Sequence, residues 1–373
     1  MQDIATACNV SVATVSRVLR DPPTHCSKAT SARVRAAADA MGYNPALFHA
    51  ARRLSLRGHG KKSLNHLIAL IFPEGFNYAW YFNTILNGLM EVLTEEGFGL
   101  LTIETTHSAT DEMPPSLFRG DVDGIFVSTK SQRFQPMLNT LRESSGFAER
   151  PVVFLMDELA GCSSVRADKT AGARAALGYL LDLGHRHIAY LHQRDGFDQV
   201  VRPIEEHYLG YVQACKERGL VPEEHLYGAD IGVDLWRYAF DTHHFPKLLS
   251  VEAICASATA VPLLHELRIH PITAIMAPND SSALIIYHLL RQHEIRIPTD
   301  ISLIGFDDTI PLLNKQREEI LSNVRVPLFD IGRTAARLML DQISGNVTGR
   351  CVEILPTTFI DRATTALPRS NVE

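Results

Sequence analysis

A helix-turn-helix pattern occupies residues 3–19 of the chain, which read DIATACNVSVATVSRVL. The letters before Asn9 fit a short helix, Asn9 and Val10 fit a turn, and Ser11 is a residue type that caps the helix after it. Two short helices joined by such a turn form a common DNA-binding unit. The pattern therefore predicts a small helical domain in this part of the chain.

The positions of this segment separate at helical spacing into an inward and an outward face. We expect the inward face to hold Ile4, Ala5, Val10, Val15, Val18 and Leu19. Small apolar side chains can touch a thymine methyl group, and an arginine can donate two hydrogen bonds to a guanine. An ordinary helical hairpin would show the same local pattern. The predicted DNA-binding residues are Ser11, Val12, Ala13, Thr14, Ser16 and Arg17, of which Val12, Ala13, Ser16 and Arg17 are expected to face outward.

A third helix is predicted from Lys28 to Met41, and Gly-Tyr-Asn-Pro follows it at residues 42–45. Together with VATVSRVL at residues 12–19, this arrangement closely resembles the lactose-repressor (LacI/GalR) family of bacterial transcription regulators. The resemblance implies a DNA-binding head over residues 1–45, in which Asn44 is also a predicted contact. The family usually has a capping Thr before the first helix, so we expect Met1 to be an internal methionine of a longer natural chain.

The length and composition suit more than one globular domain. A chain of 373 residues exceeds one ordinary domain, and 46% apolar residues are enough for full cores. The sequence contains neither an apolar run of bilayer length nor a charged start followed by a hydrophobic stretch. We therefore expect a cytoplasmic protein with no membrane partner.

Charge is distributed unevenly along the chain. Residues 1–62 hold ten Lys or Arg against three Asp, a net charge of +7, so the total of −6 leaves −13 for the rest. A basic head on an acidic body predicts that the head meets phosphate, although a solvated run of charges would look the same. The six cysteines lie far apart without a C-x-x-C pair, so neither a metal site nor a cofactor is expected.

Residues 46–63 are predicted to form a hinge between the head and the body. In the family, such a segment folds as a helix on DNA and inserts a Leu into the minor groove, which bends the duplex. The family motif Ala-x-x-Leu appears as ARRL at residues 51–54, about two residues farther from Pro45 than is usual in the family. We assign the inserted residue to Leu54, with Leu47 and Leu56 as alternatives. A flexible basic linker would have the same composition.

From Leu64 onward, short apolar runs alternate with amphipathic stretches, which predicts parallel sheets covered by helices on both faces. The expected strands are residues 66–72, 99–103, 123–128, 151–156, 187–192, 272–277 and 302–306. The expected helices are residues 83–96, 169–183, 208–218, 281–293 and 329–343.

Further sequence motifs of the family occur along the body: VRAD at 165–168, LGHRHIA at 183–189, APND at 277–280, IPTDISLIGFDD at 297–308 and LPT at 355–357. The resemblance implies a small all-α helix-turn-helix head plus an α/β two-lobed body, like that of periplasmic sugar-binding proteins, over residues 64–365. The chain is expected to cross between the lobes near residues 165, 323 and 347 and to end in a tail at 366–373. Residues 221–271 match weakly and stay unassigned.

Side chains just past the strand ends are candidate effector ligands, because open parallel sheets bind ligands there. Asn279 offers donors and an acceptor and Asp307 offers two acceptors, which together suit neighbouring hydroxyl groups. Each could instead be a helix cap or a loop tie, and Asp168 is expected to cap a helix or tie the lobes. Residues 72–82 are rich in aromatic side chains, which pack on sugar rings, on another lobe or on a subunit. The predicted effector-binding residues are Phe76, Tyr78, Trp80, Asp157, His207, Trp236, Asn279 and Asp307.

His207 is a departure from the family pattern. The family commonly has Arg three residues before a Gly-aromatic pair, which is Gly210-Tyr211 in this chain. Histidine cannot make the forked contact of an arginine, so the usual sugar chemistry is altered here. Arg202 lies five residues earlier and is the alternative source of that contact.

Catalytic signatures such as G-x-S-x-G and H-E-x-x-H do not occur, so we do not expect an enzyme. We expect a sequence-specific DNA-binding transcriptional regulator, a repressor, that binds a pseudo-palindromic operator as a homodimer. A small carbohydrate-like effector is expected to control it. The alternatives are a cytoplasmic sugar-binding protein without productive DNA binding and an α/β enzyme with an accessory head.

Overall fold

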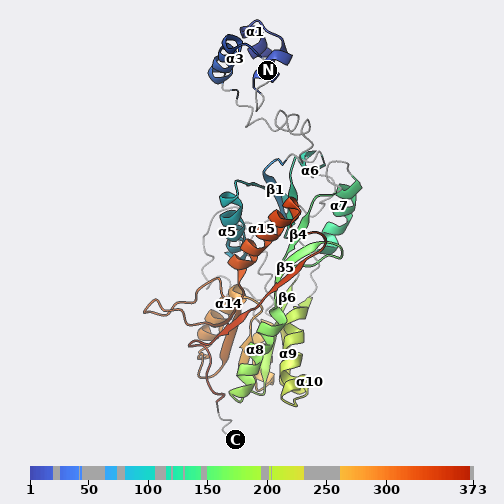
Figure 1. Ribbon diagram of the computed structural model, residues 1–373. Coiled ribbons are helices and arrows are strands. Elements are labelled where there is room, and N and C mark those ends of the chain that lie inside the picture. Colours follow the sequence, from blue (N-terminus) through green and yellow to red (C-terminus); the bar gives the residue numbers. More distant parts are fainter. Residues whose placement is uncertain are drawn as a thin grey trace.

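The computed structural model describes residues 1–19, 26–41, 43, 64–73, 80–105, 115–118, 121–128, 131–143, 149–194, 201–202, 204–230 and 261–369 (Figure 1). These residues form a helical head and two α/β lobes with mainly parallel sheets. The predicted fold class is therefore confirmed.

In the described residues of the head, three short helices surround a small core. They are α1 (Gln2–Ala7), α2 (Val12–Val18) and α3 (Lys28–Ala40). Ser11 caps α2, because its Oγ accepts a hydrogen bond of 3.1 Å from the backbone N–H of Thr14. The buried core residues are Ile4, Ala5, Cys8, Val15, Val18, Val34 and Ala38, against which Val10 and Leu19 pack while partly exposed.

The sheet of the first lobe is entirely parallel. Its strands are β1 (Leu67–Pro73), β2 (Gly99–Thr105), β3 (Gly124–Val127), β4 (Val152–Leu155), β5 (Ser163–Ala167) and β12 (Val352–Leu355), in the order β12-β5-β4-β3-β1-β2. Ile68 and Leu70 of β1 pack toward α5 (Trp80–Glu95) and α15 (Leu328–Ser344). Ala69 and Ile71 pack toward the opposite side, with α6 (Pro115–Phe118) and α7 (Ser131–Glu143). Burial of both faces explains the continuous apolar run of β1.

Two glycines let α5 and α15 pack closely, and the helices lie side by side in Figure 1. A Cβ on Gly88 would collide with the carbonyl oxygen of Phe329, and a Cβ on Gly332 would collide with that of Ile85. The backbones therefore touch where a larger residue would hold them apart.

The second lobe has a mixed sheet in the order β13-β11-β10-β9-β6-β7, with β8 also paired to β6. The pairs β11–β13 and β6–β7 are antiparallel and the others are parallel. The strands are β6 (Ile188–Arg194), β7 (Val201–Arg202), β8 (Leu226–Asp230), β9 (Ala274–Met276), β10 (Ser302–Asp307), β11 (Ser322–Arg325) and β13 (Thr358–Ile360). The helices are α8 (Lys169–Asp182), α9 (Glu205–Glu217), α10 (Pro222–His225), α13 (Val261–Ile269) and α14 (Asp280–Gln292).

The chain passes three times between the two sheets: after β5, after β11, and between β12 and β13. The third passage lies at residues 356–357 and not near 347, where we expected it. The reason is that β12 pairs with β5 of the first lobe, so the chain stays in that lobe until Leu355. Asp168 caps α8, because its Oδ1 accepts a hydrogen bond of 2.9 Å from the backbone N–H of Ala171. A helix cap was one of the two roles expected for this residue.

One hydrophobic cluster runs through both lobes. It contains Leu70 and Met339 of the first lobe together with Leu177, Tyr211 and Phe306 of the second. A separate cluster fills the other side of the second sheet, under α13 and α14. In the part of the chain that the structure describes, no helix has the length and apolar content needed to cross a membrane.

Candidate functional site

The outer face of α2 is the candidate DNA-binding surface. Val12 is 37% exposed, and Ser11, Ala13 and Arg17 are exposed as well. Arg17 donates a hydrogen bond of 3.3 Å from Nε to the carbonyl oxygen of Ala13, a bond that uses only one of the five N–H groups of its guanidinium. This geometry leaves an arginine and two small apolar side chains facing outward on one helix.

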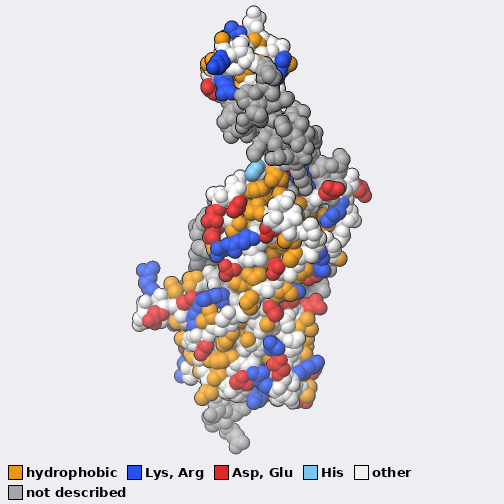
Figure 2. Space-filling model, in the orientation of Figure 1, with side chains coloured by type: hydrophobic (Ala, Val, Ile, Leu, Met, Phe, Trp, Pro, Cys, Tyr) orange, Lys and Arg blue, Asp and Glu red, His pale blue; other side chains and the backbone are white. Residues whose placement is uncertain are grey.

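Two predicted members of this surface are less exposed than expected. Ser16 and Thr14 are half-buried. The hydroxyl of Thr14 lies 2.9 Å from that of Ser11, so both hydroxyl groups already take part in the cap of α2. Further basic side chains of the head are exposed on α3, and Figure 2 shows Lys and Arg on the visible face of the head. These exposed residues of α3 are Lys28, Arg33 and Arg35.

A second candidate site lies where the two lobes meet. Asp307 ends β10, and Asn279 follows β9 and caps α14 by accepting a hydrogen bond of 2.9 Å from the N–H of Ser282. The helix-cap alternative for Asn279 therefore applies, and its amide NH2 group is not used in that bond. Asp157 lies in the turn after β4, where its Oδ1 accepts a hydrogen bond of 2.7 Å from the N–H of Glu158.

Asp307 has an unusual backbone and an unusual carboxyl group. Its φ is +96° and that of Asp308 is +57°, a region that residues other than glycine seldom adopt and that is often found at functional sites. Burial and the neighbouring Asp280 carboxylate raise the pKa of Asp307 to about 7, while the Lys169 ammonium acts in the opposite direction. At neutral pH this carboxyl group is thus poised between its two charge states.

Tyr81 lies in the first turn of α5, in the first lobe, within range of the charge of Asp307 in the second lobe. Burial, the Asp307 carboxylate and the Glu206 carboxylate together hold the pKa of Tyr81 well above its usual value. The phenol is therefore neutral and available as a hydrogen-bond donor. Sequence reasoning missed Tyr81, although it stands next to Trp80 in the aromatic stretch at residues 72–82.

His207 lies in the first turn of α9 and is only 4% exposed. Its ring stacks on Phe306, with ring centroids 3.8 Å apart and planes inclined by 24°. Burial and the Lys169 cation hold the pKa of His207 well below its usual value, so the imidazole is neutral. Its buried Nε2 has no hydrogen-bond partner among the described residues.

Ion pairs connect the crossing strand β5 to both lobes. Arg166 lies 3.5 Å from a carboxylate oxygen of Glu158 in the first lobe and 4.0 Å from one of Glu206 in the second. The Nζ of Lys169 also lies 3.9 Å from Glu206, and Arg350 pairs with Glu158. The sequence pattern did not identify Glu206 or Lys169, because their proximity depends on how α8 and α9 meet.

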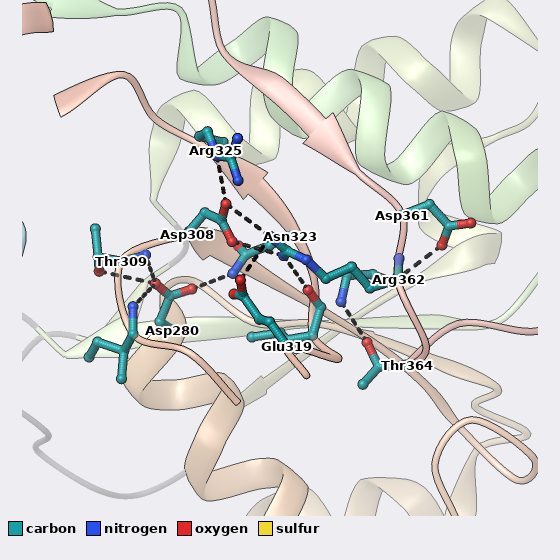
Figure 3. Close-up of polar contacts among 12 residues, drawn as sticks. Asp280, Asp308, Thr309, Glu319, Asn323, Arg325, Asp361, Arg362 and Thr364 are labelled. Atoms are coloured by element: carbon teal, nitrogen blue, oxygen red, sulfur yellow. Dashed lines mark hydrogen bonds and ion pairs between the residues drawn. The ribbon is translucent and has the colours of Figure 1, made fainter. Parts of the chain in front are cut away.

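The buried Asp280 carboxylate, which raises the pKa of Asp307, belongs to a network of polar contacts (Figure 3). The Asp280 carboxylate accepts hydrogen bonds from the backbone N–H groups of Thr309 and Ile310, from the Thr309 hydroxyl at 3.0 Å, and from Asn323 Nδ2 at 2.6 Å. Burial raises the pKa of Asp280, and these four bonds oppose the shift. The network fixes the loop after β10 to the strand through which the chain leaves this lobe.

Asp308 belongs to the same network but faces two arginines. Arg325 Nε lies 2.7 Å from one of its oxygens, and Arg362 Nη1 lies 2.8 Å from the other (Figure 3). Although burial acts in the opposite direction, these two guanidinium groups hold the pKa of Asp308 below its usual value. Each candidate ligand, Asn279 and Asp307, is thus followed in sequence by an aspartate that anchors it to β11.

Several predicted residues lie outside the described residues: Asn44 and Leu54 with the alternatives Leu47 and Leu56, and Phe76, Tyr78 and Trp236. Trp80 begins α5, but its side chain also lies outside the described part. Within the described residues, no group of three or more His, Cys, Asp or Glu side chains is placed to hold a metal ion. His185 is a structural residue, since its ring nitrogens bond to Thr273 and to the backbone carbonyl of Ala366.

Comparison with known proteins identifies the head and the second part of the body as known domain types. Residues 1–46 match the model of bacterial regulatory proteins of the lacI family, and residues 177–365 match that of the periplasmic binding protein-like domain. The HTH-type transcriptional repressor CytR of Escherichia coli is 26% identical over 382 residues, which cover 99% of this chain and 97% of CytR. The HTH-type transcriptional regulator MalR of Streptomyces coelicolor is 28% identical, over 98% of this chain and 96% of MalR.

Solved structures show the same fold. The lac repressor dimer bound to operator and the anti-inducer ONPF superposes with a TM-score of 0.64, at 20% identity, over 98% of each chain. The complex of the transcriptional regulator CelR with cellobiose superposes with a TM-score of 0.61, at 21% identity, over 97% of this chain and 98% of CelR. The chain belongs to the LacI family of bacterial regulatory proteins, which are DNA-binding transcriptional regulators and not enzymes, and it carries the family's periplasmic binding protein-like effector domain.

Proposed function

We propose that the protein is a repressor that binds a pseudo-palindromic operator as a homodimer and that a small carbohydrate-like effector controls it. The observation that carries the proposal is the outer face of α2, where Val12, Ala13 and Arg17 are exposed on a packed three-helix head. A single head of this size reads only a few base pairs, and two heads related by a two-fold axis supply both affinity and specificity. Homologous repressors such as CytR and the ribose operon repressor of Bacillus subtilis support the same direction of control.

Within this proposal the chain is divided into a head at residues 1–45, a hinge at 46–63, an effector domain at 64–365 and a tail at 366–373. The proposed DNA contacts are Ser11, Val12, Ala13, Thr14, Ser16, Arg17 and Asn44, with Leu54 inserted into the minor groove. The proposed site of action is the cytoplasm, where regulators of this family meet DNA.

The effector is proposed to bind where the lobes meet, against Asp157, His207, Asn279 and Asp307. Tyr81 is added to this set because the charge of Asp307, in the opposite lobe, acts on its phenol. Relatives solved with cellobiose and with ribose support a carbohydrate-like ligand. Since Tyr81 and Asp307 belong to different lobes, a ligand that bonds to both would favour one lobe arrangement and thereby change the orientation of the two heads.

Selection from a randomised duplex pool at near-physiological salt, followed by sequencing of the bound DNA, tests the proposal. A two-fold symmetric site with a flexible pyrimidine–purine step at its centre is the expected result. Enrichment of a single asymmetric half-site would contradict the dimer. No enrichment, even with an N-terminally extended chain, would favour the alternative of a sugar-binding protein without productive DNA binding.

Removal of residues 1–62 separates the two activities. The truncated chain is expected to keep effector binding and to lose DNA binding, because the basic head supplies the phosphate contacts. If the truncated chain still bound DNA as tightly as the full chain, the assignment of DNA binding to the head would be wrong.

A further inference from the structure

We propose that Asp123 is a positioning residue for DNA binding, because its buried carboxylate fixes the point at which the chain from the head enters the first lobe. The inference rests on the proposed dimeric repressor and concerns how the body holds the two heads. It is carried by the polar contacts of Asp123 with Asn65 and Arg150 and by the places of these residues in the first sheet.

Asp123 binds the first residues of the body through its side chain and through its backbone. The N–H of Asn65 donates to both carboxylate oxygens, at 3.0 and 2.8 Å, and Asn65 Nδ2 donates to Oδ1 at 3.3 Å. The N–H of Asp123 donates to the carbonyl oxygen of Leu67 at 2.7 Å. Asn65 and Asp123 are both buried, so these hydrogen bonds are costly to break.

Arg150 compensates the charge of this carboxylate. Its Nη1 lies 3.0 Å from Oδ1 of Asp123, whose side chain is 1% exposed, while that of Arg150 is 22% exposed. Removal of such a partner leaves a buried charge uncompensated. We call Asn65, Asp123 and Arg150 the entry cluster.

The three members of the entry cluster precede three neighbouring parallel strands. Asn65 stands just before β1, Asp123 before β3 and Arg150 before β4, and the sheet order is β4-β3-β1. The chain leaves the parallel strand β5 for the second lobe, so the carboxyl ends of these strands point toward that lobe. A shift of the first lobe is therefore carried by hydrogen-bonded strands to the residues at which the head is attached.

Residues 46–63 connect the head to the entry cluster, so the cluster sets where this connection begins in the body. Two linked heads gain affinity from each other only when both can reach their half-sites at once. A fixed starting point restricts the half-site spacings that both heads can reach, whereas a loosened one widens them. We therefore expect the entry cluster to determine how strictly the protein discriminates between operators of different spacing.

Operators that differ only in spacing test the inference on the full-length chain. Fluorescence anisotropy would compare the selected operator with one that carries two extra base pairs at its centre, which move one half-site by about 7 Å and turn it by about 70°. We expect the wild type to lose about a hundredfold in affinity on this change. In Asp123→Ser and in Arg150→Met the loss is expected to shrink to less than about tenfold, because the entry of the chain is no longer held.

Two further variants separate positioning from stability. Arg150→Lys keeps a cation beside Asp123 and is expected to retain the full spacing penalty. Val153→Ala, at a buried position of β4, destabilises the first lobe through a cavity but leaves the entry cluster intact, so it should retain the penalty as well. Hydrogen exchange gives a readout without DNA: exchange of the Asn65 N–H should accelerate in Asp123→Ser and not in Arg150→Lys.

An unchanged spacing penalty in Asp123→Ser and Arg150→Met, or an equal reduction in Val153→Ala, would overturn the inference. So would a wild type that binds both spacings equally well. If Asp123→Ser does not fold, Arg150→Met decides alone, because its side chain is partly exposed. A symmetric operator without any effect of the variants would refute only the inference. A wild type that selects no symmetric operator would refute the repressor, and the exchange of the Asn65 N–H would still test the entry cluster.

Discussion

Asn323 Nδ2 donates a hydrogen bond of 2.6 Å to Asp280, and this bond joins the strand that leaves the second lobe to the first turn of α14. Both side chains are buried, so the bond lies in a setting where a lost donor is costly. The residue before Asp280 is Asn279, a candidate effector ligand. The bond therefore fixes the geometry of the effector site to the connection between the lobes.

Asn323→Ala is expected to lower the free energy of unfolding by about 1–3 kcal/mol, because a buried carboxylate loses one of its donors. Urea denaturation followed by circular dichroism would measure the change. Asn139→Ala, on the exposed face of α7, is the control and should change stability by less than about 0.5 kcal/mol. Similar small decreases in the free energy of unfolding of both variants would show that the hydrogen bond from Asn323 to Asp280 does not stabilise the fold.

Asp307→Asn is expected to stabilise the protein at pH 8 and to change little near pH 4. The pKa of Asp307 is about 7 in the folded chain against an ordinary value of 3.8, so the folded state holds this proton more tightly than the unfolded state. Stability from this group is present at low pH and is lost as pH rises from about 4 to 7. The asparagine has no such loss, and the gain has an upper limit of about 4 kcal/mol.

Thermal unfolding midpoints of the wild type and of Asp307→Asn between pH 4.5 and 8.5 would reveal this difference. Asp330→Asn, at an exposed position in the first turn of α15, is the matched control and should give parallel curves. A constant offset between wild type and Asp307→Asn across the range would mean that Asp307 titrates normally.

Arg17→Ala is expected to weaken operator binding by about 1–3 kcal/mol while leaving binding to random DNA nearly intact, because Arg17 faces outward from α2 and suits a guanine. Titrations of both DNAs by fluorescence anisotropy would measure the two affinities. Arg35→Ala, on the exposed side of α3, is expected to weaken both about equally through lost phosphate contact. Equal losses for Arg17→Ala on both DNAs would assign Arg17 to the DNA backbone.

Gly332→Ala is expected to destabilise the first lobe by about 1–3 kcal/mol, because the added methyl group must separate α15 from α5. Chemical denaturation would measure the loss. Arg337→Ala, at an exposed position of the same helix, changes helix composition without touching α5 and is the control. Equal stability of the two variants would mean that the helices slide apart at no cost.

The head was predictable from the sequence because its packing is local. The cap at Ser11 and the buried positions Val15 and Val18 follow directly from helical spacing within a short segment. Ser16 was expected to face outward and is half-buried, because helical spacing alone does not show how much of a side chain its surroundings cover.

The lobes were predictable in type but not in every element. Alternating apolar runs indicated most strands, yet β8 and α13 lie in residues 221–271, where no clear periodicity appears. The short strand β12 was missed as well, because its partner β5 lies almost 190 residues earlier and only the folded sheet brings them together. The position of the third crossing was wrong for the same reason.

The candidate site shows a similar division. Asn279, Asp307 and His207 lie in or beside recognisable sequence motifs, so the sequence was sufficient to predict them as effector-binding residues. Tyr81 could not be proposed from the sequence, because it belongs to the opposite lobe. Glu206 could not be proposed either, because its position depends on the packing of α9 against α8. Neutrality of His207 is likewise a property of its burial and not of its sequence neighbours.

The late position of β12 and β13 has a consequence for the order in which the protein is completed during translation. The edge strand of the first sheet is made at residues 352–355, and the strand that closes the second sheet is made at 358–360. A ribosome has therefore synthesised the whole head, and nearly all of both lobes, before either sheet receives its last strand. A chain that stops a few dozen residues early would release a complete DNA-binding head attached to two incomplete lobes. Such a product would keep the part that binds DNA and lack a complete effector domain.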